Sequence, residues 1–186
     1  MIYAANPLAE NILWRNHQSL RDHILAEYHA YLPAVRNHLQ SATSLIHFTF
    51  DNWTSIGGKK ALTGICVHHL DVNGQIQDYL LGLPHLSGKH LGATIGGAVN
   101  STLEAFEIMS QQVGYFVLDN ATNNDTAVET LGEIHSFNAV HRRLRCTCHI
   151  LNLAAQTIIW GKDKDCFENA QLNIAVKSLS LSLFFR

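Results

Sequence analysis

Two largely apolar runs along the chain each lead into an aspartate. The first covers residues 45–50 and is followed by Asp51, and the second covers residues 113–118 and is followed by Asp119. A run that is apolar on both faces is typical of a central β-strand. Acidic side chains at the C-terminal ends of such strands lie where the ligands of open α/β sheets usually bind. The pattern therefore predicts two central strands that each present a carboxylate at one edge of the sheet.

An antiparallel hairpin is predicted between the two runs. Asn73-Gly74 separates apolar stretches at 61–70 and 75–83, and Asn-Gly in such a place is the strongest short hairpin signal. The remaining expected elements are helices at residues 8–32, 34–40, 90–112, 126–135 and 149–160 and a strand at 144–147, with Pro33 ending or restarting the first helix and Gly114 capping the third. The helix at 90–112 has apolar residues on one shared face, namely Leu91, Ile95, Val99, Leu103, Phe106 and Met109.

This order of elements predicts an α/β fold with a mixed five-stranded sheet. Three antiparallel strands come first and parallel strands follow, with flanking helices and an N-terminal helical lead-in. The first and fourth strands are then neighbours, so the carboxylates of Asp51 and Asp119 are expected about 4 to 6 Å apart, where charges couple strongly. The expected organisation is a lead-in at 1–44, a core at 45–160 and a divergent tail at 161–186.

Two interpretations of the aspartates remain open from spacing alone. Convergent carboxylates repel each other unless a cation lies between them, and hard oxygen ligands suit Mg²⁺ or Mn²⁺. Aspartate is also common at strand ends because its side chain accepts hydrogen bonds from nearby backbone amides. The segment from Asp119 to Asp125 has the composition of such a turn followed by a helix N-cap.

Composition restricts how the protein can contact nucleic acid. The chain has 186 residues, 47% of them hydrophobic and 15% charged, which is enough for one packed core. Its net charge of −2 gives no overall attraction to a polyanion, so any contact with DNA has to be local. The best local candidate is the basic run with Arg142, Arg143 and Arg145, although such a run is more often a solvated strand edge.

The cysteines indicate an intracellular, reducing compartment. Four cysteines occur without a signal peptide or the dense spacing of a disulfide framework. Cys146, Cys148 and His149 are too few for a structural zinc site, which needs four ligands. No apolar stretch approaches the length of a transmembrane helix, so a membrane is not an expected partner. A small-molecule substrate is not expected either.

Three motifs occur here in one order, at residues 51–55, 118–124 and 145–153, and read DNWTS, LDNATNN and RCTCHILNL. Together they resemble the catalytic core of hAT-superfamily DNA transposases, with wording closest to the fungal elements. The resemblance implies an RNase H-like fold, nuclear localisation and metal-dependent DNA transposition. It also implies that Asp51 and Asp119 hold Mg²⁺ or Mn²⁺ and that Cys146 and His149 form the family's Cys-x-x-His pair.

Two further side chains have alternative roles. His149 either contacts DNA near the scissile phosphate or satisfies a buried polar contact at the start of a helix. Trp53, just beyond the first acid, either packs on the sheet, which is the commoner role, or stacks on a base.

The sequence departs from the family pattern in its third acid and its dimerisation region. The carboxylates at Asp163, Asp165 and Glu168 come too soon after the second acid to be the family's distant Glu. A truncated core without the third acid or the dimerisation region is therefore expected, weak in DNA binding and inactive by itself. The alternative is a non-catalytic, transposase-derived module that binds nucleic acid or protein. The alternating segment at 178–185 predicts an exposed strand prone to self-association.

Overall fold

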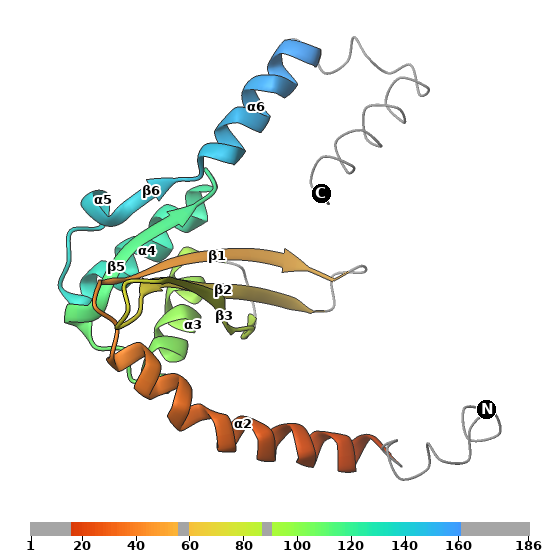
Figure 1. Ribbon diagram of the computed structural model, residues 1–186. Helices are drawn as coiled ribbons and strands as arrows, with labels where there is room; N and C mark the ends of the chain where they lie inside the picture. Colours follow the sequence, from red (N-terminus) through yellow and green to blue (C-terminus); the bar gives the residue numbers. More distant parts are fainter. Residues whose placement is uncertain (1–15, 56–59, 87–90, 161–186) are drawn as a thin grey trace.

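A computed structural model of the protein describes residues 16–55, 60–86 and 91–160 (Figure 1). The elements are α2 (His17–Gln40), β1 (Ile46–Thr54), β2 (Ala61–Leu70), β3 (Ile76–Gly82), β4 (His85–Leu86), α3 (Gly92–Ala105), η2 (Ser110–Gln112), β5 (Val113–Leu118), α4 (Thr122–His135), α5 (Ala139–Arg142), β6 (Arg143–Arg145) and α6 (Thr147–Trp160). The start of the predicted lead-in helix, at residues 8–15, and the whole predicted tail at 161–186 lie outside the described residues.

The strands form one mixed sheet in the order β3-β2-β1-β5-β6, with β4 paired to β2 off this path. β2 is antiparallel to β1 and β3, whereas β5 is parallel to β1 and β6. The predicted α/β fold, with three antiparallel strands followed by parallel strands, is confirmed. The sequence does not predict β4, because Pro84 has no N–H to donate. The carbonyl of Pro84 instead accepts the N–H of Thr63, which keeps the chain alongside β2.

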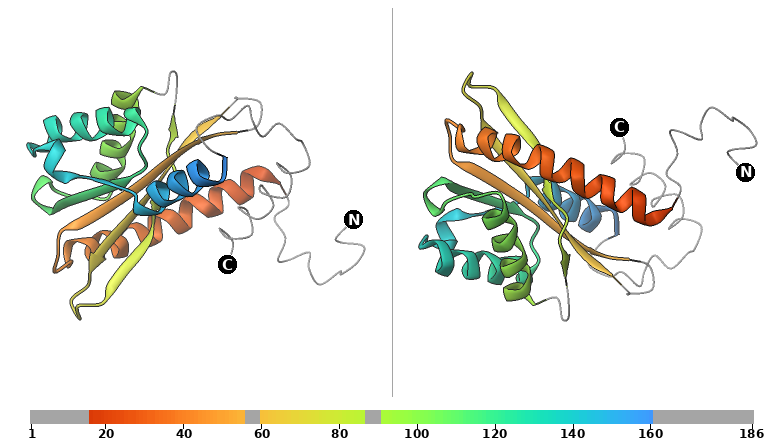
Figure 2. Two further views of the ribbon diagram at one scale, coloured as in Figure 1. Left: turned by 90° about the horizontal axis from the view of Figure 1, so that it is seen from above. Right: turned by 90° about the horizontal axis from the view of Figure 1, so that it is seen from below.

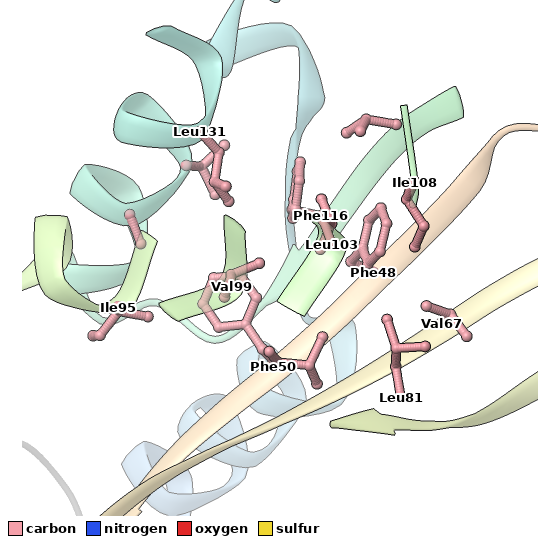
Figure 3. Close-up of a cluster of buried hydrophobic side chains, with 14 of the residues drawn as sticks. Phe48, Phe50, Val67, Leu81, Ile95, Val99, Leu103, Ile108, Phe116 and Leu131 are labelled. Carbon is pink, nitrogen blue, oxygen red and sulfur yellow. The ribbon is translucent and has the colours of Figure 1, made fainter. Parts of the chain in front are cut away.

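One face of the sheet carries the hydrophobic core. Side chains alternate along β1, so Ile46, Phe48 and Phe50 are buried while the residues between them are more exposed. Helices α2, α3 and α4 pack over this face, and Figure 2 shows α2 running alongside the strands. Phe48 of β1 stacks on Phe116 of β5 with ring centroids 5.3 Å apart (Figure 3). This packing holds β1 and β5 side by side, as the candidate site requires.

Helix α2 continues through Pro33, where the sequence predicts a break. A proline inside a helix removes one backbone hydrogen bond and crowds the preceding turn. Leu32 and Val35 pack against the core on either side of it, and Leu39 is fully buried there. Burial of this apolar stripe outweighs the local cost, so one long helix replaces the two predicted ones.

Helix α3 is shorter than the helix predicted at 90–112. It ends at Ala105, and Glu107 beyond it adopts a left-handed φ of 58°. Arg36 of α2 donates to the carbonyl oxygen of Ala105, and Gln40 donates to that of Glu107. The end of α3 is therefore set by side chains of a distant helix, which local periodicity cannot register.

Gly114 lies within β5 and does not cap a helix, so the predicted cap is wrong. A Cβ added at Gly114 would lie 2.5 Å from Nδ1 of His47 and 2.8 Å from the carbonyl oxygen of Ile46. The pairing of β1 with β5 shifts register between Ile46 and Phe48. At this irregularity Nδ1 of His47 accepts the N–H of Tyr115 at 3.0 Å. The glycine is required by the close approach of the two strands.

Several boundaries also differ from the predicted ones. β1 continues past Asp51 to Thr54, because β2 pairs with it throughout this stretch. Asp51 therefore lies inside β1, at a point where the pairing with β5 has already ended. Helix α4 begins at Thr122 and α6 at Thr147, both earlier than predicted.

Candidate active site

The two aspartates line one cavity of about 400 Å³ that lies over the central strands of the sheet. Its walls come from the middle of β1 and β2, the end of β5 and the first turns of α6. The lining residues that carry polar or sulfur side chains are Thr49, Asp51, Cys66, Asp119, Cys146, Cys148, His149 and Asn152. The parallel pairing of β1 with β5 thus brings together residues that are 68 positions apart in sequence. The expected 4 to 6 Å separation of the carboxylates stays a prediction.

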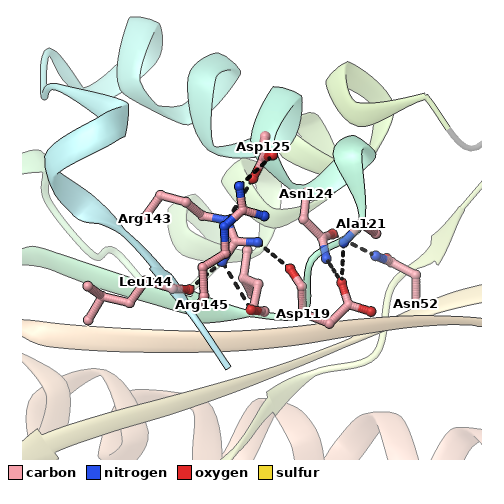
Figure 4. A network of polar contacts seen from close by, with 9 residues as sticks. Asn52, Asp119, Ala121, Asn124, Asp125, Arg143, Leu144 and Arg145 are labelled. Carbon is pink, nitrogen blue, oxygen red and sulfur yellow. Dashed lines mark hydrogen bonds and ion pairs between the residues drawn. The ribbon is translucent and has the colours of Figure 1, made fainter. Parts of the chain in front are cut away.

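Asp119 is held in a fixed orientation where β5 ends. Its Oδ1 accepts hydrogen bonds from the N–H of Ala121 at 2.9 Å and from the side-chain amide of Asn124 at 2.7 Å (Figure 4). Among the described residues, no hydrogen bond reaches its Oδ2. One oxygen therefore forms the turn that the sequence also allows, and the other remains available to a ligand at the cavity.

Hydrogen bonds between the side chains of Asn124, Asn52 and Thr63 support the orientation of Asp119. Asn124 is 4% exposed, and its Oδ1 accepts a 3.4 Å hydrogen bond from Asn52 of β1. The Oδ1 of Asn52 in turn accepts the hydroxyl of Thr63 at 2.6 Å. These contacts link β2, β1 and α4 behind the two carboxylates. The sequence motifs contain both asparagines, but without the fold nothing marks them as positioning residues.

Asp51 is more exposed than Asp119. Its Oδ1 accepts the N–H of the next residue, Asn52, at 2.8 Å. Across the hairpin Asp51 pairs with Gly64, which also lines the cavity.

The side chain of Arg143 is buried and makes its contacts within the protein. Its side chain is 7% exposed, and its Nε lies 3.1 Å from Oδ1 of Asp125. Its guanidinium also donates to the carbonyl oxygens of Leu144 and Asp119 (Figure 4). A further hydrogen bond to the carbonyl oxygen of Leu118 holds the end of β5 in place. Burial lowers the pKa of Arg143, and the neighbouring Asp125 opposes this, so the group keeps its charge. Contact of Arg143 with DNA stays a prediction, and its visible role is to position Asp119.

The other two arginines of the basic run are more accessible. Arg145 is half-exposed and shares Asp125 with Arg143, with its terminal nitrogen 3.0 Å from Oδ2. Arg142 lies over the ring of Tyr115, 5.3 Å from its centroid. The run thus divides into one internal arginine and two at the surface.

The Cys-x-x-His segment, at the start of α6, forms one wall of the cavity. The N–H of Cys146 donates to the carbonyl oxygen of Leu118 at 2.8 Å, which fixes the start of α6 beside the end of β5. His149 follows one turn later and lines the cavity. Trp53 is 43% exposed, and its ring lies 3.0 Å from the place of a Cβ at Gly64. The ring of Trp53 therefore rests on the backbone of β2.

The donor set fits part of a metal site. Carboxylate oxygens are the ligands that Mg²⁺ and Mn²⁺ prefer, and Asp51 and Asp119 offer them at one cavity. Within the described residues, no three or more histidine, cysteine, aspartate or glutamate side chains are grouped closely enough to hold an ion. The two aspartates can therefore supply two protein ligands, with the rest of the coordination open to water or substrate.

The order and directions of the strands are those of an RNase-like fold. Residues 49–145 match the family model of the ZBED1 RNase-like domain, which is more than half of the chain. The chain belongs to this family. The predicted relationship to hAT-type transposases and the RNase H-like fold are both confirmed.

Curated relatives extend the comparison beyond the domain. "Putative AC transposase" of Zea mays is 29% identical over 125 residues, which cover 63% of this chain and 15% of that protein. "Putative transcriptional regulator tpeD" of Talaromyces stipitatus is 26% identical over 144 residues, covering 67% of this chain and 17% of that protein. The chain thus spans about a sixth of the length of these relatives. Among the described helices, none has the length and apolar character needed to cross a membrane.

Proposed function

We propose that this chain carries the two-carboxylate part of a site for metal-dependent DNA strand cleavage and transfer, acting in the nucleus. The observation that supports the proposal is the cavity shared by Asp51 and Asp119, which come from two neighbouring parallel strands. Cys146 and His149 line the same cavity, as the resemblance to hAT transposases implies. The named transposase among the relatives supports the same class of substrate.

In this proposal each side chain of the cavity has a separate task. Asp119 offers Oδ2 to a Mg²⁺ or Mn²⁺ ion while Oδ1 keeps the carboxylate oriented through Ala121 and Asn124. Asp51 would supply the second carboxylate, and His149 would donate to a phosphate oxygen from the wall formed by α6. A metal held by Asp51 and Asp119 would supply activation of the attacking oxygen and stabilisation of the leaving oxygen in an in-line displacement.

DNA binding by the chain should be weak, largely independent of sequence and strongly reduced by salt. The net charge of −2 gives no long-range attraction, so neutralisation of phosphates rests on a few cations such as Arg142 and Arg145. Contact by Arg143 would require it to leave Asp125 and the carbonyl groups that it holds.

A second candidate function is a non-catalytic module that binds nucleic acid or protein. It is favoured by the relative whose name describes a transcriptional regulator. The two candidates differ in one property, because a catalytic site must bind a divalent ion between the aspartates and a binding module need not.

Mn²⁺ binding separates the two. The fraction of free Mn²⁺ is measured by electron paramagnetic resonance during titration of the whole chain. Asp51→Asn and Asp119→Asn should each weaken binding at least tenfold, because each removes one of two charged ligands. Asp78→Asn, at an exposed position of β3, is the matched control and should leave binding unchanged. Binding that is absent in the wild-type chain, or equal in all variants, would favour the non-catalytic module.

A further inference from the structure

The face of the sheet opposite the core has an aromatic surface next to the carboxylate cavity. Helices α2, α3 and α4 pack on the core face, and within the described residues the first turns of α6 border the other face. This open face carries the alternate side chains of each strand, which are His47, Thr49, Asp51 and Trp53 on β1 and Tyr115 and Val117 on β5. Both strands lead along this face to the carboxylate cavity.

Three side chains of different elements stack at one end of the open face. The ring of His47 from β1 lies 5.6 Å from that of Tyr115 from β5, at an interplanar angle of 23°. The guanidinium of Arg142, from α5, lies 5.3 Å from the centroid of the Tyr115 ring. Tyr115 remains 38% exposed. The group therefore combines aromatic surface with a positive charge.

Contacts with the backbone of β5 hold the ring of His47 in place. Nδ1 of His47 accepts the N–H of Tyr115, which ties the imidazole to the backbone of the neighbouring strand. Gly114 leaves room for that imidazole, since a Cβ there would overlap it. A stacking surface that is already ordered loses little conformational entropy when a ligand binds.

The stack is also aligned with the carboxylates. Tyr115, Val117 and Asp119 alternate onto the same face, and Asp119 lies four positions beyond Tyr115. At the rise of a β-strand this is about 13 Å, a span of a few nucleotides. Val117 and Thr49, which follow the stack along β5 and β1 and line the cavity, carry no charge.

We propose that His47, Tyr115 and Arg142 form a stacking platform for an unpaired base of a DNA strand whose phosphate backbone reaches the carboxylate cavity. This inference rests on the proposed function and adds to it the single-stranded character of the substrate next to the site. An aromatic ring stacks on any base, whereas Arg142 neutralises a phosphate or extends the stack, so binding has little sequence preference.

The test uses the whole chain and two fluorescent 12-nucleotide probes, oligothymidine and an abasic strand with the same phosphates. Binding is followed by fluorescence anisotropy. Tyr115→Ala should weaken oligothymidine binding about five- to 100-fold, because it removes one stacking partner. Binding to the abasic strand should change less than twofold. Tyr31→Ala, at an exposed tyrosine of α2, is the matched control and should leave both affinities unchanged.

Two further variants separate stacking from folding. Tyr115→Phe keeps the ring and should bind oligothymidine like the wild type, whereas Tyr115→Leu keeps apolar packing and should bind like Tyr115→Ala. Thermal unfolding by circular dichroism establishes that each variant is folded. Equal affinity of wild type and Tyr115→Leu for oligothymidine would overturn the proposal. A Tyr115→Leu variant that changes the sedimentation coefficient of the free chain would also overturn it, by making the open face a contact between copies.

Failure of this inference and failure of the proposed function give different results. Mn²⁺ binding depends on Asp51 and Asp119, and it should be the same in Tyr115→Leu as in the wild type. If the aspartate variants lose Mn²⁺ but Tyr115→Leu still binds oligothymidine normally, the metal site stands and the platform does not exist. If oligothymidine binding requires Tyr115 but Mn²⁺ never binds, the chain is a non-catalytic module.

Discussion

At the scale of single residues, three histidines are shielded from water in ways that favour their neutral forms. Desolvation is the main cause that lowers the pKa of His47, His69 and His135 below the ordinary 6.5. His47 must also keep Nδ1 unprotonated, because that atom accepts the N–H of Tyr115. Each of these groups therefore resists protonation in the folded state more than in the unfolded chain.

These histidines predict that the fold loses stability in mild acid. Their folded-state pKa values lie below those of the unfolded chain, so the unfolded chain binds more protons as the pH falls below about 6.5. The stabilisation is fully present above that pH and is lost as the pH falls through the folded-state pKa values. Urea unfolding at intervals from pH 8 to pH 5 should show a falling free energy of unfolding.

The contribution of one histidine can be isolated. His135 bridges Ser110 and Asn100, and His135→Gln should flatten the dependence on pH while costing about 1 kcal/mol at pH 8 for altered hydrogen bonds. His17→Gln, at the exposed start of α2, is the matched control and should leave the curve unchanged. A free energy of unfolding that is constant from pH 8 to pH 5 would contradict this account.

At the scale of elements, helix α2 is fastened to the end of α3 by polar side chains as well as by apolar packing. Two nitrogens of Arg36 donate to the carbonyl oxygen of Ala105, at 3.1 and 2.7 Å, and a third lies 2.6 Å from the carboxylate of Glu107. Gln40 donates to the carbonyl oxygen of Glu107 at 2.6 Å. These bonds satisfy carbonyl groups that the helix itself leaves unpaired.

Removing this attachment should weaken the whole fold. Arg36→Ala is expected to lower the free energy of unfolding by about 1 to 2 kcal/mol, because it leaves the carbonyl of Ala105 without its charged donor. Urea unfolding at neutral pH measures the loss. Arg21→Ala, at an exposed position near the other end of α2, should change stability by less than about 0.5 kcal/mol. Equal effects of the two substitutions would show that the contacts of Arg36 contribute little.

At the scale of the whole molecule, the distribution of acids limits what the chain can do alone. The described residues place Asp51 and Asp119 at the cavity, and no third acidic, histidine or cysteine ligand completes a metal-binding group with them. Positioned charge supplies most of the acceleration in phosphoryl transfer, so an incomplete ligand set is expected to give little catalysis.

We therefore predict that the isolated chain neither cleaves nor joins DNA. Incubation of the pure chain with Mg²⁺ or Mn²⁺ and with nicked or hairpin duplexes should give background products, as judged on denaturing gels. Cleavage that disappears in both Asp51→Ala and Asp119→Ala would contradict this prediction. A local acid such as Glu168 would then complete the site, and Glu168→Gln tests whether it does.

The sequence by itself determines the order of the elements and the identity of the acids. The alternating and continuous apolar runs predict β1, β2 and β5, and Asn73-Gly74 predicts the β2–β3 hairpin, where Gly74 has a φ of 72°. These features depend on residues close together in the chain, whose periodicity and turn chemistry act locally. The neighbouring positions of β1 and β5, and with them the shared cavity of Asp51 and Asp119, follow from the same order.

The tertiary structure alone decided how individual side chains are used. The fold buries the side chain of Arg143 at the end of β5 and places the side-chain amide of Asn124 within hydrogen-bond distance of Asp119. It also packs the ring of His47 against Gly114. Helix α2 also continues through Pro33, because burial of its apolar side against the core outweighs the tendency of proline to end a helix. Each of these outcomes depends on partners far away in sequence, so neither periodicity nor a short motif can specify which neighbour satisfies a given polar group.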